Sequence, residues 1–199
     1  MNTLLKYIND SILDIEKDRQ RTLWPLLDYI QDQLDLGLVP QLNFICTHNS
    51  RRSQLAQVWM QTLANFKGFN IHCFSGGVEV TACANQTIHV LRKCGFTIDQ
   101  MSAGSNPIYL IQNNDLQISL FSKLFDDKIN PTQNFAAVMT CDHAEANCPF
   151  VPGASKRIAV TYEDPKLFDG TKEEELQYER RCTQMASEMK WVVDNLKKR

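Results

Sequence analysis

Long apolar runs and a surplus of charge of one sign are both missing from this chain of 199 residues. No stretch approaches the roughly 18 uninterrupted apolar residues of a membrane-spanning helix. The first residues are interrupted by charges and lack the apolar core and cleavage site of an export signal. A net charge of −2 gives no general attraction for nucleic acid or an anionic membrane. We therefore expect a cytoplasmic protein with neither partner, whose anionic ligands bind to a few locally placed groups.

A structural disulfide framework is not expected either, although the chain has seven cysteines, at positions 46, 73, 83, 94, 141, 148 and 182. In a reducing compartment each cysteine is either a small buried hydrophobic residue or a working thiol. Those at 73, 83, 94 and 182 lie within apolar or helical patterns, so we interpret them as core or surface residues. The other three need a separate explanation.

The periodicity of apolar residues changes near residue 40. In residues 1–39 apolar residues recur every three to four positions, which predicts an N-terminal helical extension. It could pack on the rest of the chain or on a second copy, so a monomer and a homodimer both stay open. Residues 40–199 are interpreted as the catalytic domain. Within it, residues 103–134 mix turn residues with short apolar runs and are expected to form a surface excursion with one or two short elements.

Short β-prone runs alternate with helical patterns beyond residue 40. The runs are Leu42–Cys46, Ile71–Phe74, Phe135–Thr140 and Ile158–Thr161, and the helical patterns cover 52–66, 82–94 and 172–197. Such alternation predicts an α/β, flavodoxin-like three-layer fold with a four-stranded parallel sheet. Ligands bind at the carboxyl ends of the strands in such sheets. Because Cys46 ends the first run and Cys141 follows the third, we expect the two to be neighbours.

The residues after Cys46 predict an anion-binding loop between a strand and a helix. In this arrangement backbone N–H groups and the helix dipole converge on an anion and favour the thiolate form of a cysteine. Arg52 can grip two oxygens, Ser53 can donate to the thiolate, and Asn49 tolerates a left-handed backbone. The loop lacks the glycines and the Lys-Ser/Thr pair of a nucleotide-binding loop.

This segment resembles the Cys-x5-Arg-Ser loop of the low-molecular-weight protein tyrosine phosphatases and of the arsenate reductases that share their fold. It reads Cys46-Thr47-His48-Asn49-Ser50-Arg51-Arg52-Ser53. The resemblance covers about residues 41–197 and implies a nucleophilic cysteine followed by an oxyanion-binding loop over 47–52. His48 stands where a glycine is usual, and Arg51 replaces a second loop cysteine. A buried strand-end cysteine beside a surface arginine is the alternative interpretation.

An Asp-Pro dipeptide follows the fourth β-prone run. The resemblance implies that Asp164 is the general acid, which protonates the leaving oxygen during attack by the thiolate. Pro165 holds the preceding residue in an extended conformation. Lys166 and Leu167 stand where the phosphatases have aromatic residues for the substrate phenol. A simple turn is the alternative for this dipeptide.

The segment VMTCDHAEANCPFVPG resembles the redox segment of thioredoxin-coupled arsenate reductases. The resemblance implies a Cys46–arsenate adduct, then a Cys46–Cys141 disulfide, then a Cys141–Cys148 disulfide that thioredoxin or another thiol reduces. Zinc binding by Cys141, His143 and Cys148 is an alternative, but the spacing is wrong for a zinc knuckle and a second cysteine pair is missing. Two unreactive buried cysteines are the other alternative.

These features favour a thiol-dependent arsenate reductase that needs no metal and no cofactor. The runner-up is a low-molecular-weight protein tyrosine phosphatase that hydrolyses phosphotyrosine or a small phosphoester through a cysteinyl-phosphate. A non-enzymatic sensor of an oxyanion is a third class, which the intact set of Cys46, Arg52 and Asp164 disfavours.

Overall fold

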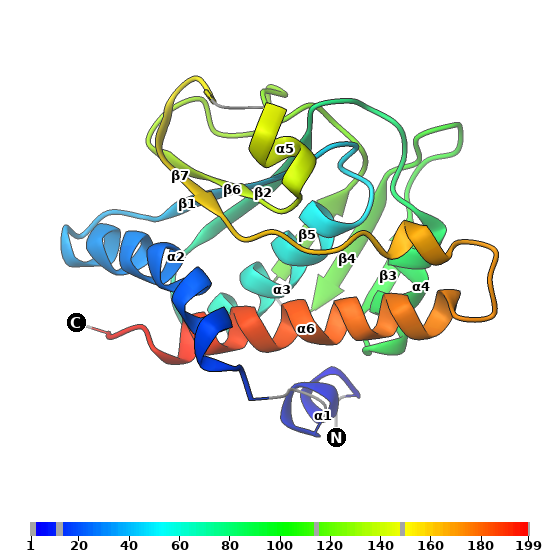
Figure 1. Ribbon diagram of the computed structural model, residues 1–199, viewed down its shortest axis with the longest axis horizontal. Helices are drawn as coiled ribbons and strands as arrows, with labels where there is room; N and C mark the ends of the chain where they lie inside the picture. The colour runs from blue at the N-terminus through cyan, green and yellow to red at the C-terminus, as the bar shows by residue number, and fades with distance from the viewer. Residues whose placement is uncertain (1–2, 11–13, 114–115, 148–149, 199) are drawn as a thin grey trace.

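The computed structural model describes residues 3–10, 14–113, 116–147 and 150–198 (Figure 1). The helices are α1 (Thr3–Asp10), α2 (Lys17–Asp35), α3 (Arg52–Phe66), α4 (Asn85–Lys93), α5 (Asp142–Asn147) and α6 (Glu174–Asp194), with a 3-10 turn η1 (Pro165–Phe168). The strands are β1 (Gln41–Cys46), β2 (His72–Gly77), β3 (Thr97–Gln100), β4 (Tyr109–Asn113), β5 (Leu116–Leu120), β6 (Phe135–Met139) and β7 (Ala154–Ala159).

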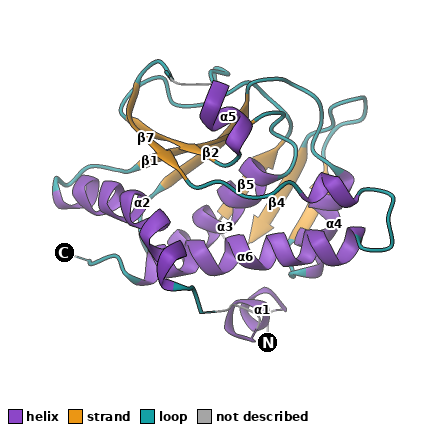
Figure 2. Ribbon diagram, in the orientation of Figure 1, coloured by secondary structure: helices purple, strands orange, loops and turns teal. Residues whose placement is uncertain are grey.

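The main sheet has four parallel strands in the order β2-β1-β6-β7. Helices α3 and α6 lie against one face, and the short helix α5 lies on the other (Figures 1 and 2). The predicted fold class, an α/β fold with a four-stranded parallel sheet flanked by helices, is confirmed. Crossover connections carry all four strands in one direction, so their carboxyl ends meet at one edge.

The predicted boundaries are close for the buried elements and poorer at the sheet edge. Helix α3 covers the predicted 52–66, because its apolar face is regular. Strand β7 was predicted over 158–161 but spans Ala154–Ala159. It is an edge strand in which solvent-facing polar residues precede Ile158, so a search for apolar runs starts too late.

A second sheet with antiparallel order β3-β4-β5 lies in the segment between the second and third parallel strands, after helix α4. Short elements were predicted there, and two of these strands lie within 103–134. The prediction of a surface excursion was wrong, however. One face of this sheet is buried in the main core through Ile98, Tyr109, Ile111, Ile118 and Leu120. Each strand exposes its alternate residues, which conceals the buried face in a mixed sequence.

The two N-terminal helices pack on the rest of the chain. Leu4 and Ile8 of α1 and Ile30 of α2 belong to the main core. Arg19 of α2 makes a bidentate ion pair with Glu188 of α6, with N–O distances of 2.7 and 2.8 Å. The predicted extension is therefore helical and contributes to the same core, while a boundary at residue 39 stays a prediction. No helix within the described ranges is long and apolar enough to cross a membrane.

The parallel sheet separates two cores of unequal size. The main core lies on the side of α3 and α6. The smaller core has eight buried residues, and packs under α5 and the loops above the sheet: Ile45, Cys46, Phe135, Ala137, Met139, Cys141, Ala144 and Val151. Cys46 and Cys141 therefore share this smaller core, at the carboxyl ends of two adjacent strands.

Candidate active site

The loop after β1 presents its carbonyl groups to the surrounding scaffold. The oxygens of residues 47–51 accept hydrogen bonds from Glu79 N, Ser122 Oγ, Gln54 Nε2, Ala84 N and Leu55 N respectively, at 2.6 to 3.1 Å. Within the described part of the chain, the N–H groups of residues 47–51 donate to no backbone or side-chain acceptor. Five outward carbonyls leave the intervening N–H groups free to converge on an anion, and anion binding by this loop stays a prediction.

Two features fix the shape of this loop. Asn49 has a φ of 46°, the left-handed conformation that its side chain tolerates. Gly77, at the end of the neighbouring strand, lies so close that a Cβ there would meet Asn49 N at 2.7 Å and Thr47 O at 2.8 Å. A Cβ on Gly76 would meet Phe125 Cα at 2.3 Å. The glycines of β2 thus allow the chain to run directly beside the loop.

A chain of hydrogen bonds prepares the thiol of Cys46, which is 3% exposed. Lys123 N donates to Asn49 Oδ1 (3.1 Å), and this fixes the orientation of the Asn49 amide. Asn49 Nδ2 then donates to Ser53 Oγ at 2.9 Å, and Ser53 Oγ lies 3.1 Å from Cys46 Sγ. Because Ser53 Oγ already accepts a hydrogen bond from Asn49 Nδ2, its own hydroxyl proton can be donated to the sulfur. A thiolate stabilised in this way is a competent nucleophile.

Replacing Ser53 by alanine should slow the first chemical step by about tenfold to a hundredfold, because it removes one hydrogen bond to a charged sulfur. The measurement is the rate of Cys46 alkylation by iodoacetamide at pH 7, together with kcat. Ser155→Ala on β7, which removes a hydroxyl bonded to Phe135 O, is the matched control. Equal alkylation rates in the two variants would contradict the assignment of Ser53.

Arg52 and Asp164 lie together beside the loop. The Arg52 guanidinium donates to Tyr162 O at 3.1 Å and to Asp164 Oδ2 at 2.6 Å. Asp164 also caps the turn η1, since its Oδ1 accepts from Lys166 N at 3.1 Å. Both side chains are less than one-third exposed. The predicted anion clamp and the predicted acid thus come to the same end of the sheet as Cys46.

His48, Ser50 and Arg51 of the loop contact different partners outside it. His48 Nε2 lies 3.3 Å from Glu79 Oε2, and Ser50 is held through its carbonyl by Thr87 Oγ1 at 3.1 Å. The guanidinium of Arg51 binds Tyr178 and Asp169. The backbone of Arg51 therefore belongs to the loop, while its side-chain charge is paired with Asp169 outside the loop.

Cys141 contacts the loop through Thr47. Its sulfur is buried and lies 3.5 Å from Thr47 Oγ1, which is also 3.4 Å from His143 Nδ1. The N–H of Ala144, in the first turn of α5, donates to the same sulfur at 3.3 Å. The expected closeness of Cys46 and Cys141 is thus present, with one loop residue between them. Cys148, the predicted third thiol, lies outside the described residues.

The remaining four cysteines, for which core and surface positions were both expected, are all buried. Burial raises the pKa of the Cys73 and Cys182 thiols well above its ordinary value, and raises that of Cys83 to about 12. All four are free thiols, as are Cys46 and Cys141. Raised pKa values keep these three groups protonated and unreactive at neutral pH.

Sequence reasoning missed the segment that supports the loop from outside. Ser122 and Lys123 hold the loop through His48 O and Asn49 Oδ1, and Lys123 is 4% exposed. Burial lowers the pKa of Lys123 to about 8. A signal was present in the sequence, because this lysine interrupts the apolar run LFSKLF. A lone charge within such a run indicates either a solvated face or a buried functional amine.

A cavity of about 490 Å³ opens beside the loop. His48, Ser50 and Arg51 line it on the loop side, and Lys166 lines it from the turn that follows Asp164. The rest of its wall comes from residues 81–86, Gly104, Ser105 and Pro107. A single tetrahedral oxyanion fills only a small part of this space.

The parallel sheet, the cysteine at the end of its first strand and the loop that follows define an α/β protein with a cysteine-containing loop at the carboxyl edge of its sheet. Residues 41–199 match the family model of the low molecular weight phosphotyrosine protein phosphatases, and the chain belongs to this family.

Relatives and similar structures come from two branches of this family. The arsenate reductase of Halalkalibacterium halodurans is 26% identical over 131 residues, which are 66% of this chain and 78% of that protein. That of Staphylococcus aureus is 28% identical over 123 residues, 61% of this chain and 76% of that protein. A phosphotyrosine phosphatase from Vibrio cholerae superposes with a TM-score of 0.54 at 12% identity, and covers 78% of this chain and 95% of its own. An arsenate reductase in the phosphate-binding state superposes with a TM-score of 0.51 at 18% identity, and the match covers 80% of this chain and 100% of that one.

Proposed function

We propose that this protein is a thiol-dependent arsenate reductase, in which Cys46 is the nucleophile and Cys141 and Cys148 carry the disulfide. The observation that carries the proposal is the contact between Thr47 Oγ1 and Cys141 Sγ at 3.5 Å, which brings a second thiol against the anion loop. Hydrolysis of a phosphoester needs one thiol, whereas reduction of arsenate needs a second thiol within reach. The sequence similarity to arsenate reductases supports the same choice.

The first step forms a bond between Cys46 Sγ and arsenic. The free N–H groups of residues 47–51 bind the arsenate oxygens, and Arg52 exchanges its contact with Asp164 for the anion. One oxygen leaves arsenic as water after Asp164 gives it a proton. Arsenic remains in its pentavalent state in this adduct.

The second step reduces arsenic. The Cys141 thiolate attacks Cys46 Sγ, the sulfur–arsenic bond breaks, and its electron pair stays on arsenic, which leaves as trivalent arsenite. A Cys46–Cys141 disulfide remains. The Cys148 thiolate then attacks Cys141 Sγ and releases Cys46 as a thiolate. A thioredoxin or another dithiol reduces the Cys141–Cys148 disulfide and completes the cycle.

The distinguishing experiment supplies arsenate, thioredoxin, thioredoxin reductase and NADPH, with p-nitrophenyl phosphate as a parallel substrate. Cys141→Ser and Cys148→Ser should each abolish steady-state NADPH oxidation and leave hydrolysis of the ester within about twofold, because the ester reaction uses Cys46 alone. Cys73→Ala is the matched control and should keep both activities. If the two serine variants keep their arsenate turnover, the relay is rejected.

Hydrolysis of a phosphoester is the second candidate, and the 490 Å³ cavity favours it. A leaving group larger than hydroxide fits beside the loop, between Lys166 and Arg51. In that reaction Cys46 forms a cysteinyl-phosphate and water releases phosphate. Efficient turnover of esters without any turnover of arsenate would establish this candidate instead.

A further inference from the structure

Arg51 takes part in a closed network of hydrogen bonds with two distant residues. Its Nε donates to Tyr178 Oη at 2.6 Å, and its Nη2 donates to Asp169 Oδ2 at 3.1 Å. Tyr178 Oη in turn donates to Asp169 Oδ1 at 2.9 Å. The Arg51 side chain is 13% exposed and Tyr178 is 2% exposed, so water competes little with these bonds.

The protonation states in this network are well defined. Burial raises the pKa of the Tyr178 phenol, which therefore stays neutral and donates its proton to Asp169. Burial also opposes the charge on Arg51, but the bond to Tyr178 and the carboxylates of Asp164 and Asp169 raise the pKa of its guanidinium overall. Arg51 and Asp169 thus form an ion pair that a neutral hydroxyl bridges.

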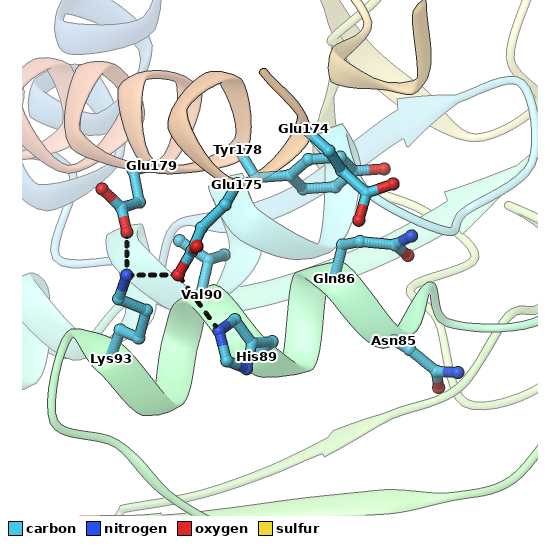
Figure 3. A pocket seen from close by; sticks show the side chains of 9 residues that line it. All are labelled: Asn85, Gln86, His89, Val90, Lys93, Glu174, Glu175, Tyr178 and Glu179. Atoms are coloured by element: carbon cyan, nitrogen blue, oxygen red, sulfur yellow. Dashed lines mark hydrogen bonds and ion pairs between the residues drawn. The ribbon is translucent and has the colours of Figure 1, made fainter. Parts of the chain in front are cut away.

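Tyr178 is placed by the packing of α6 against α4. In the groove between these helices Lys93 binds Glu175 at 2.6 Å and also binds Glu179 (Figure 3). The phenol of Tyr178 points away from these ion pairs (Figure 3). Its hydroxyl therefore reaches the anion loop from a rigid helix.

Asp169 ends the same short segment that Asp164 begins. Asp164 caps η1, and Asp169 N bonds back to Lys166 O at 3.0 Å, so the turn joins the two carboxylates rigidly. Arg52 holds the start of this segment through Asp164, and Arg51 holds its end through Asp169. Two consecutive arginines of the anion loop thus fasten the segment at both ends.

We propose that Arg51 is a positioning residue, which fixes the segment 164–169 so that the Asp164 carboxyl faces the oxyanion. This rests on the proposed function, in which Asp164 is the acid. Arg51 stands where the resemblance expects a second loop cysteine. A cysteine side chain in this position would be too short to reach Asp169, so the contact with the end of the segment depends on the arginine.

The test measures kcat and KM for arsenate in Arg51→Cys, Arg51→Lys, Tyr178→Phe and Asp164→Asn, with the double variant of Arg51→Cys and Asp164→Asn. Arg51→Cys should lower kcat about tenfold to a hundredfold with little change in KM, since the acid is misplaced while the N–H cradle remains. Arg51→Lys keeps the ion pair and should recover part of the loss. In the double variant the Arg51 change should add nothing to the loss from Asp164→Asn.

Hydrogen exchange of the amides of residues 164–170 gives a readout independent of activity. It should be faster in Arg51→Cys and Tyr178→Phe. Glu163→Gln is the matched control, because it breaks the ion pair with Arg181 next to Asp164 without touching the network, and should leave both kcat and exchange unchanged. Full additivity in the double variant, or unchanged exchange in Arg51→Cys, overturns the proposal. A normal kcat in Asp164→Asn refutes the acid assignment instead, and the exchange experiment still decides whether Arg51 holds the segment.

Discussion

Replacing Cys46 by serine is expected to lower turnover of arsenate and of p-nitrophenyl phosphate by at least about 10⁴-fold, because a hydroxyl in this position has no base to activate it. The described residues near Cys46 offer Ser53 as a hydrogen-bond partner, but neither Asn49 nor Ser53 can accept a proton permanently. A thiol in this position differs because its sulfur can attack as a thiolate, whereas an alcohol must lose its proton to a base. Steady-state kinetics with both substrates measures the effect.

The cradle itself should survive this substitution. The outward carbonyls of residues 47–51 and the Arg52 side chain do not depend on the sulfur, so phosphate should still bind. Calorimetric titration with phosphate therefore separates loss of the nucleophile from loss of the loop. If Cys46→Ser keeps more than a small fraction of turnover while it is folded and binds phosphate, another nucleophile must be at work. That result would falsify the mechanism for both candidate functions.

Replacing Lys123 by methionine is expected to stabilise the protein at pH 7 by as much as about 3 kcal/mol. Burial lowers the pKa of Lys123 from 10.5 to about 8, while Asp127 attracts the charge and offsets part of this effect. Each unit of pKa corresponds to about 1.4 kcal/mol of difference between the two protonation states. Methionine has a similar length, and carries no charge into the buried site. Some attraction is lost, since Lys123 Nζ lies 4.9 Å from the centre of the Phe121 ring.

The stabilisation should depend on pH in a defined direction. Below about pH 8 Lys123 is charged in the folded and in the unfolded chain, so the folded protein carries the full cost of burying the charge. Between pH 8 and about 10.5 the unfolded chain keeps the proton that the folded chain has lost, and wild-type stability rises with pH relative to the variant. The advantage of Lys123→Met should therefore shrink over this window.

Urea unfolding of both proteins at pH 7 and pH 10 measures this difference, in which the other titrating groups cancel. Lys128→Met is the matched control, because Lys128 is exposed on the same segment, and it should change stability little at either pH. The backbone bond from residue 123 to Asn49 Oδ1 persists in Lys123→Met, so the loop should keep its shape. If Lys123→Met is less stable than the wild type at pH 7, the attraction of the ammonium to its neighbours outweighs the cost of burying its charge.

The parallel sheet could be predicted because its central strands, β1 and β6, are largely apolar and buried and its long helices are regular. The antiparallel sheet could not, since its strands have only four or five residues and alternate buried residues such as Ile111 and Ile118 with more exposed ones. Its burial depends partly on contacts between β5 and α3, two elements that lie far apart in the sequence. Local patterns contain no information about such partners.

The candidate site was predictable where one short segment contains the chemistry. Residues 46–53 lie on consecutive positions, so their types and order indicate an anion loop directly. The roles of Arg51 and Lys123 depend on residues more than 70 positions away, namely Tyr178 for the first and Asn49 for the second. The direction in which the Arg51 side chain turns is decided by α6, and the sequence of the loop gives no indication of it.

The unequal cores on the two faces of the sheet give the two faces different costs of opening. Local opening needs little free energy where few apolar contacts are broken, and approaches the global free energy of unfolding in a large core. The face with α5 and Cys141 has only eight buried residues among those described, whereas Asn49 and Ser53 are anchored on the side of α3. In the proposed relay α5 must shift so that Cys141, bonded first to Cys46, can then bond to Cys148. This fold lets that helix fluctuate on its own while the loop that holds the oxyanion stays rigid.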